Sequence, residues 1–167
     1  MLDEQQKREM VFGFFKTNFP FVLCPANFTR SSELPNLDWV KVKYTERDGH
    51  NFPDKKGVYI FMVSVSHANL PENSYVMYVG KAGELNTDNT IAKRFLDYVY
   101  PSKYKSRNRI KKMIQFFSDH LYYYYAETPD GQSPGEIEQM LADIFVPPCC
   151  QKDFSAEGRS LVRGTRL

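Results

Sequence analysis

The sequence predicts an α/β fold: a small three-stranded, mainly antiparallel sheet flanked by helices, with an N-terminal helix and an edge-strand extension. Two β-branched and aromatic runs, residues 57–65 and 74–79, have the pattern of strands covered on both faces. A third run, residues 121–126, contains four consecutive tyrosines and predicts another strand. Segments with helical periodicity lie between and after these runs, so we expect strands and helices in one mixed domain.

An N-terminal extension, residues 1–56, precedes this core. Residues 3–17 predict a helix that ends before Pro20 and carries one apolar side, formed by Met10, Val11, Phe14 and Phe15. Residues 39–44 alternate apolar and basic side chains, which predicts a half-exposed strand at the edge of the sheet.

The helices of the core follow from periodicity and from proline positions. Residues 91–100 predict a helix that stops before Pro101, and a basic loop then leads to a second helix, residues 109–118. Pro134 begins a third helix, because proline suits the first helical position. Its apolar stripe has the spacing of a core-facing helix and consists of Ile137, Met140, Leu141, Ile144 and Phe145. Residues 152–167 form a tail to which the sequence assigns no structure.

Composition excludes several classes of protein. The chain has 167 residues with 42% hydrophobic and 15% aromatic content, enough for one domain with a real core. No apolar run approaches the roughly 18 residues of a membrane helix, so we expect a soluble, cytoplasmic chain without a membrane partner. Three cysteines and three scattered histidines predict neither a disulfide framework nor a zinc site.

Basic residues concentrate in one segment although the formal net charge is only +2. Between Lys93 and Lys112 the chain has eight basic residues and one acid, Asp97. Such a segment either holds phosphates by charge or forms a solvated surface loop. The residues predicted to bind nucleic acid are Lys103, Lys105, Arg107, Arg109 and Lys112, together with Gln151 near the end of the core.

A few polar residues stand where phosphate chemistry could take place. Lys81 follows a strand that ends in Gly80, where a ligand can approach the backbone closely. Arg94 and Tyr98 are four residues apart on one helix and therefore share a face. A guanidinium group there can bind phosphate and stabilise developing negative charge. Each residue also has a structural explanation: tyrosines fill cores, and Arg94 can form an ion pair with Asp97 or Glu84.

In their order along the chain these residues resemble the GIY-YIG nuclease family. Its two-part signature is matched by Gly57-Val58-Tyr59 and Tyr78-Val79-Gly80. Further matches are a basic residue after the second motif, a helix arginine with a tyrosine four residues later, and a glutamate on the last helix; here these are Lys81, Arg94, Tyr98 and either Glu136 or Glu138. The resemblance covers residues 57–151, which we treat as a GIY-YIG-like core.

The resemblance implies a metal-dependent endonuclease that hydrolyses phosphodiester bonds in DNA with one Mg²⁺ or Mn²⁺ held by the glutamate. In this family the first-motif tyrosine, here Tyr59, is thought to deprotonate or orient the attacking water. Tyr78 and Tyr98 would hold the scissile phosphate, and Arg94 would stabilise charge. Because a phenol with a pKa near 10 is a poor base, a nearby cation must lower its pKa, and we assign that role to Lys81.

Spacing favours Glu138 over Glu136 as the metal ligand, because the family has a proline and an asparagine downstream of its glutamate. Gln151 stands at the asparagine position. We expect a compact stand-alone enzyme that resembles the restriction or phage-borne types. Cutting both strands would require a homodimer or two successive nicks. The alternative is a nucleic-acid-binding module on the same fold that has lost cleavage.

Overall fold

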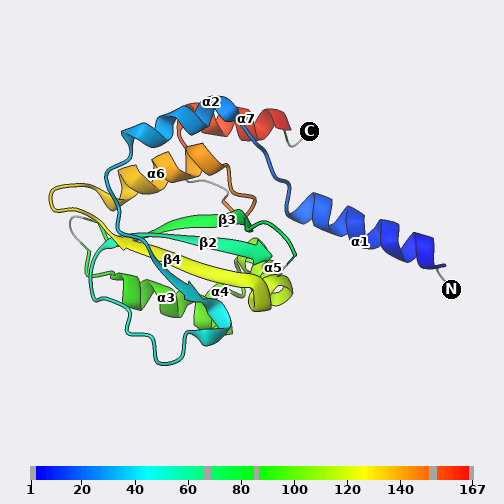
Figure 1. The fold of residues 1–167 in the computed structure, drawn as a ribbon, viewed down its shortest axis with the longest axis horizontal. Helices are drawn as coiled ribbons and strands as arrows, with labels where there is room; N and C mark the ends of the chain where they lie inside the picture. Colours follow the sequence, from blue (N-terminus) through cyan, green and yellow to red (C-terminus); the bar gives the residue numbers. More distant parts are fainter. Residues whose placement is uncertain (1–2, 66–68, 85–86, 151–153, 166–167) are drawn as a thin grey trace.

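The protein contains one four-stranded antiparallel sheet with helices on both faces (Figure 1). The structure, a computed structural model, describes residues 3–65, 69–84, 87–150 and 154–165. The strand order is β1-β4-β2-β3. The strands are β1 (Val40–Lys43), β2 (Gly57–Val65), β3 (Asn73–Ala82) and β4 (Leu121–Glu127).

Helices form a layer on each side of this sheet. On one face lie α2 (Pro25–Phe28), α6 (Pro134–Phe145) and α7 (Ala156–Thr165); on the other lie α3 (Ile91–Val99), α4 (Pro101–Tyr104) and α5 (Asn108–Phe117) (Figure 1). Short 3-10 turns are η1 (Thr29–Glu33), η2 (Tyr44–Glu46) and η3 (Ser118–His120). Among the described residues no helix is both long and apolar enough to cross a membrane.

The prediction of three strands is corrected, because the edge strand of the extension belongs to the same sheet. β1 pairs with β4 from Val40 opposite Tyr125 to Lys43 opposite Tyr122. The alternation expected of an edge strand is present, since Val42 is buried and Lys41 is exposed. The residues before the core therefore complete its sheet.

The first helix exists as predicted, but most of its apolar side is uncovered. α1 (Glu4–Asn18) projects from the body of the molecule and has no buried residue (Figure 1). Only its last turns contact the body, where Phe15 packs against the rings of Phe116 and Phe117. The helix begins at a capping box in which Asp3 accepts from the backbone of Gln6.

Three helices were not predicted, and the first of them is the short helix α2 in the segment before β1. Part of the expected basic loop is the short helix α4, which starts with Pro101 at its first position. In the tail, α7 is anchored by Phe154 and Val162, which are buried. The buried carboxylate of Asp143 on α6 accepts from the backbone nitrogen of Ser155 at 3.0 Å, which fixes the start of this helix.

Candidate active site at the outer strand

Three tyrosines of the predicted site come together on the face of the sheet that α3 covers. Tyr59 of β2 lies opposite Gly80 of β3, and Tyr78 shares that face because it is two residues from Gly80. Tyr98 of α3 places its hydroxyl 2.6 Å from that of Tyr59. Tyr59 and Tyr98 are fully buried, and Tyr78 is 7% exposed. We call Tyr59, Tyr78 and Tyr98 the tyrosine cluster.

Gly80 gives this cluster its shape. A Cβ atom added there would lie 2.4 Å from the hydroxyl oxygen of Tyr59, well inside contact distance. The motif glycine therefore makes room for a side chain of the protein itself. This differs from the expectation that the glycine lets a ligand approach the backbone.

Two arginines donate to the hydroxyls of the cluster. Arg94 Nε lies 3.2 Å from the Tyr59 hydroxyl, and its Nη1 forms a 2.8 Å ion pair with Asp97. Arg107, just before α5, places Nη2 3.2 Å from the hydroxyls of both Tyr78 and Tyr98. Because a guanidinium group only donates, each of these hydroxyls accepts at least one hydrogen bond.

Burial sets the protonation of the cluster. It raises the pKa of Tyr59 well above its usual value, and the neighbouring Tyr98 and Tyr78 raise it further, whereas Arg94 lowers it only in part. Burial likewise raises the pKa of Tyr78. Tyr59 is therefore a neutral phenol at physiological pH, which suits it to orient a ligand and opposes its predicted role as a base.

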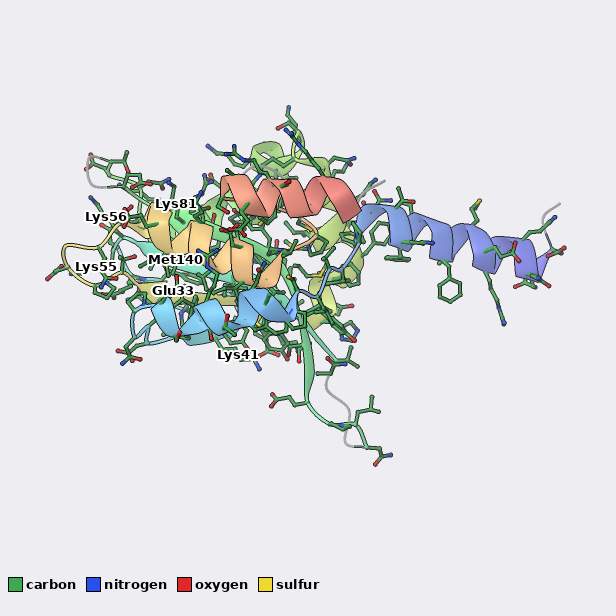
Figure 2. All side chains as sticks on the ribbon, turned by 90° about the horizontal axis from the view of Figure 1, so that it is seen from above. Glu33, Lys41, Lys55, Lys56, Lys81 and Met140 are labelled. Atoms are coloured by element: carbon green, nitrogen blue, oxygen red, sulfur yellow. The ribbon has the colours of Figure 1, made fainter. Side chains whose placement is uncertain are left out.

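Lys81 lies on the opposite face of the sheet, so it cannot lower the pKa of Tyr59 as predicted. Strand β3 extends to Ala82 and includes Lys81, and consecutive strand residues point to opposite faces. The ammonium group contacts the carboxylate of Glu84 and lies 3.8 Å from Oε2 of Glu138, beside the beginning of α6 (Figure 2). The cation next to Tyr59 is Arg94.

The surroundings of the two candidate glutamates differ. Glu138 is 8% exposed and faces Lys81, whereas Glu136 is exposed in the first turn of α6. Acids in a first turn complement the helix dipole without further function. The placement favours Glu138 as the ligand of a metal ion.

The carboxylates of Glu138 and Glu84 supply oxygen atoms, the ligand type that hard divalent cations prefer. The carboxylates of Glu84 and Glu138 converge on the ammonium group of Lys81, which marks a place where positive charge is stabilised. A Cβ at Gly135 would lie 2.6 Å from Glu84 Oε1, so the space beside these oxygens depends on a glycine. Within the described residues no group of three or more His, Cys, Asp or Glu side chains could hold a metal ion. The protein would supply one or two oxygens, and water and phosphate the others.

The predicted nucleic-acid-binding residues have different surroundings. Arg109 donates to the carbonyl oxygen of Pro148 at 2.7 Å, and Lys112 donates to Asn18 Oδ1 at 2.5 Å, so both connect parts of the protein. Lys103 and Lys105 are exposed. Arg107 joins the tyrosine cluster, and Gln151 lies outside the described residues.

The sequence did not reveal how two residues join the site: Arg107 was predicted only as one of several nucleic-acid-binding basic residues, and Glu84 only as a partner of Arg94. Arg107 is 29 residues from its partner Tyr78, and nothing in the spacing distinguishes it from the other basic residues of its segment. Glu84 was considered as a partner of Arg94, but the structure places it beside Lys81. Both contacts depend on how separate elements pack.

The unpaired edge of β3 is partly covered by the chain that follows α6. The backbone nitrogen of Cys149 donates to the carbonyl oxygen of Met77 at 3.0 Å. Cys150 Sγ accepts from the backbone nitrogen of Val79 at 3.4 Å. These contacts protect the outer strand next to the candidate site.

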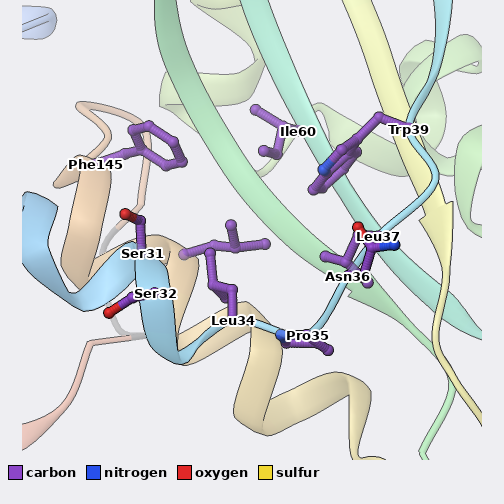
Figure 3. Close-up of a pocket in the computed structure, with 10 residues that line it drawn as sticks. Ser31, Ser32, Leu34, Pro35, Asn36, Leu37, Trp39, Ile60 and Phe145 are labelled. Atoms are coloured by element: carbon purple, nitrogen blue, oxygen red, sulfur yellow. The ribbon is translucent and has the colours of Figure 1, made fainter.

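A separate hollow of about 520 Å³ lies between the extension and α6 (Figure 3). Its lining contains no acidic or basic side chain and consists of Ser31, Ser32, Leu34, Pro35, Asn36, Leu37, Trp39, Ile60, Leu141 and Phe145. With no ionisable group, this hollow offers no general acid or base and no charged metal ligand.

No protein-family model, no curated protein and no solved structure matches the chain.

Proposed function

We propose that the protein is a metal-dependent endonuclease that hydrolyses phosphodiester bonds in DNA and works by the mechanism of the GIY-YIG family, which its motifs resemble. The observation that carries this proposal is the hydrogen-bonded chain from Arg94 through Tyr59 to Tyr98. Residues of two separate motifs meet there, and they combine fixed positive charge with phenol hydroxyls. This is the donor chemistry that phosphate oxygens require.

The two faces of β3 would have different roles. Arg94 binds the scissile phosphate and stabilises the charge that develops in the transition state. Tyr59 and Tyr98, fully buried behind the arginines, hold the guanidinium groups and orient the ligand. Glu138 would hold the divalent ion, which supplies Lewis-acid stabilisation of the phosphate oxygens. Lys81 holds the carboxylate of Glu138 in place through their ion pair.

Nicking of supercoiled plasmid DNA tests the proposal. Purified protein with Mg²⁺ or Mn²⁺ should convert supercoiled plasmid to open circles, and EDTA should stop the reaction. Glu138→Ala should abolish nicking, whereas Glu136→Ala, a matched change two residues away on an exposed position, should retain it. A wild-type protein that nicks with neither metal would contradict the proposal.

A binding module without cleavage is the second candidate, and one observation favours it. The raised pKa of Tyr59 leaves the cluster without a base, while its positive charge still suits a phosphate. This candidate predicts that a labelled duplex is retarded in a gel with and without metal and is never cut. Nicking that depends on Glu138 would exclude it.

We further propose that the enzyme is of the restriction or phage-borne type, which the motifs resemble. A single copy contains one candidate site and would cut one strand at a time. A double-strand break would therefore need two copies or two successive nicks. Sedimentation with and without duplex DNA, compared with the ratio of nicked to linear product, distinguishes these routes.

A further inference from the structure

We propose that Arg107 is a second phosphate-binding arginine, which holds the DNA phosphate together with Arg94 across the tyrosine cluster. The inference rests on the proposed function only in naming the anion as a DNA phosphate. Arg107 stands outside the motif residues, so the resemblance assigns it no role in the reaction.

The position of Arg107 carries the inference. Its Nη2 lies 3.2 Å from both the Tyr78 and the Tyr98 hydroxyl oxygens, and its guanidinium carbon lies 4.9 Å from the centre of the Tyr98 ring. Arg94 reaches the other end of the same row of hydroxyls, at Tyr59. The two guanidinium groups therefore enclose the cluster from α3 and from the start of α5.

Exposure decides which groups an incoming anion meets first. Tyr59 and Tyr98 are fully buried, whereas Arg107 is half-buried and the side chain of Arg94 is 31% exposed. An anion approaching from solvent contacts the guanidinium groups, and the phenols lie behind them. A guanidinium group carries five N–H donors, so two arginines at one row of hydroxyls bring together several donors of the kind that bind phosphate oxygens.

The charges around the two arginines also support phosphate binding by Arg107. Arg94 has an acidic partner, Asp97, at 2.8 Å. Arg107 instead contacts the hydroxyls and ring faces of Tyr78 and Tyr98, and phenols are neutral near pH 7. A half-buried guanidinium whose contacts are neutral leaves net positive charge at the site, which a bound phosphate neutralises.

A purely structural role is the alternative, since the same contacts attach the start of α5 to the tyrosines. The two roles separate in kinetics. A structural arginine affects stability, whereas a phosphate-binding one affects DNA affinity and kcat in a folded protein. Arg107→Lys keeps the charge and loses the fork that reaches two hydroxyls at once.

The experiment compares Arg107→Gln, Arg107→Lys and Arg8→Gln, with Arg8 as an exposed arginine of α1 far from the site. Each variant is checked for folding by thermal unfolding. A fluorescein-labelled DNA duplex in EDTA gives the Kd by anisotropy, and plasmid nicking with Mn²⁺ gives kcat and KM. We expect Arg107→Gln to weaken binding about tenfold and to lower kcat by about 10²-fold, with a smaller loss in Arg107→Lys. Arg8→Gln should stay within about threefold of wild type.

The outcomes separate this inference from the proposed function. If wild type cuts DNA and Arg107→Gln has the same Kd and kcat, Arg107 binds no phosphate and the inference is wrong. If wild type cuts nothing but Arg107→Gln still weakens duplex binding more than Arg8→Gln, the inference stands and the nuclease proposal fails. If Arg107→Gln does not fold, Arg107→Lys decides: unchanged Kd and kcat overturn the inference, and a loss in either supports it.

Discussion

The two faces of strand β3 differ in charge although they share consecutive residues. On the α3 face, two arginines donate to three phenol hydroxyls, and the acid present is Asp97, bound to Arg94. On the α6 face, the ammonium group of Lys81 lies between two carboxylates. One face has the chemistry to bind an anion, and the other has the chemistry to bind a cation.

This difference follows from strand geometry. Gly80 and Lys81 are neighbours in sequence, but their substituents point to opposite sides of the sheet. A reaction that needs both a bound phosphate and a bound divalent ion can obtain them from one strand, provided that the substrate lies across its outer edge. The comparison thus gives a physical reason why two short motifs on paired strands can organise a site.

The largest expected effect comes from removing charge on the anion-binding face. Arg94→Ala should lower kcat for plasmid nicking by about 10²–10³-fold, because transition-state charge loses a direct donor. Asp97→Asn, which removes only the acidic partner of Arg94, should retain activity and bind duplex more tightly. Equal kcat values for wild type and Arg94→Ala would mean that this face does not take part in the reaction.

The close packing of Gly80 against Tyr59 can be tested by measuring the free energy of unfolding. Gly80→Ala places a methyl group 2.4 Å from the Tyr59 ring and should lower the free energy of unfolding by about 1–3 kcal/mol through overpacking. Gly13→Ala on α1 meets no atom within 4 Å and should be neutral or stabilising by up to about 1 kcal/mol. Urea denaturation measures both; a neutral Gly80→Ala would mean that the cluster is loosely packed.

Alkaline pH should lower the free energy of unfolding through the buried tyrosines on the α3 face of the sheet. Burial raises the pKa of Tyr59, Tyr78 and Tyr123 in the folded state. Above pH 10 the unfolded phenols ionise while the buried ones stay protonated, so the free energy of unfolding falls as pH rises past 10. Each tyrosine contributes a slope of up to about 1.4 kcal/mol per pH unit. Tyr59→Phe should remove one such contribution, and an unchanged slope would show that Tyr59 is not desolvated.

The smallest effect concerns the chain that covers the edge of β3. Cys149 and Cys150 are buried, and burial raises the pKa of Cys149 to about 12 despite the opposing effect of Arg109. A thiol reagent at pH 8 should therefore label the half-buried Cys24 first and the other two only after unfolding. Labelling of all three at one rate would mean that this edge is open.

Local patterns predicted most of the secondary structure. The first core strand agrees with β2 at both ends, and the helix that starts at Pro134 agrees with α6. The strand predicted at residues 39–44 is present as β1, but it was assigned to an extension instead of the core sheet, because its pairing with β4 joins residues 79 to 85 positions apart in sequence. Periodicity has no information on such pairing.

The sequence predicted most residues of the candidate site but not all of their contacts. The tyrosines and Arg94 meet as expected, whereas Lys81 faces Glu138 instead of Tyr59, because the strand continues past Gly80. The predicted strand ended at residue 79, three residues before the end of β3, which was enough to assign Lys81 to the wrong face.

The sequence by itself determined the core strands, the long helices, the two motifs and their order, because these depend on side-chain type and short-range periodicity. Only the tertiary structure decided that Arg107 joins the tyrosines, that Glu138 rather than Glu136 is buried, and that the tyrosine cluster and the Lys81–Glu138 pair lie on opposite faces of β3. Those outcomes depend on which faces are packed together, and burial then sets the protonation of each group.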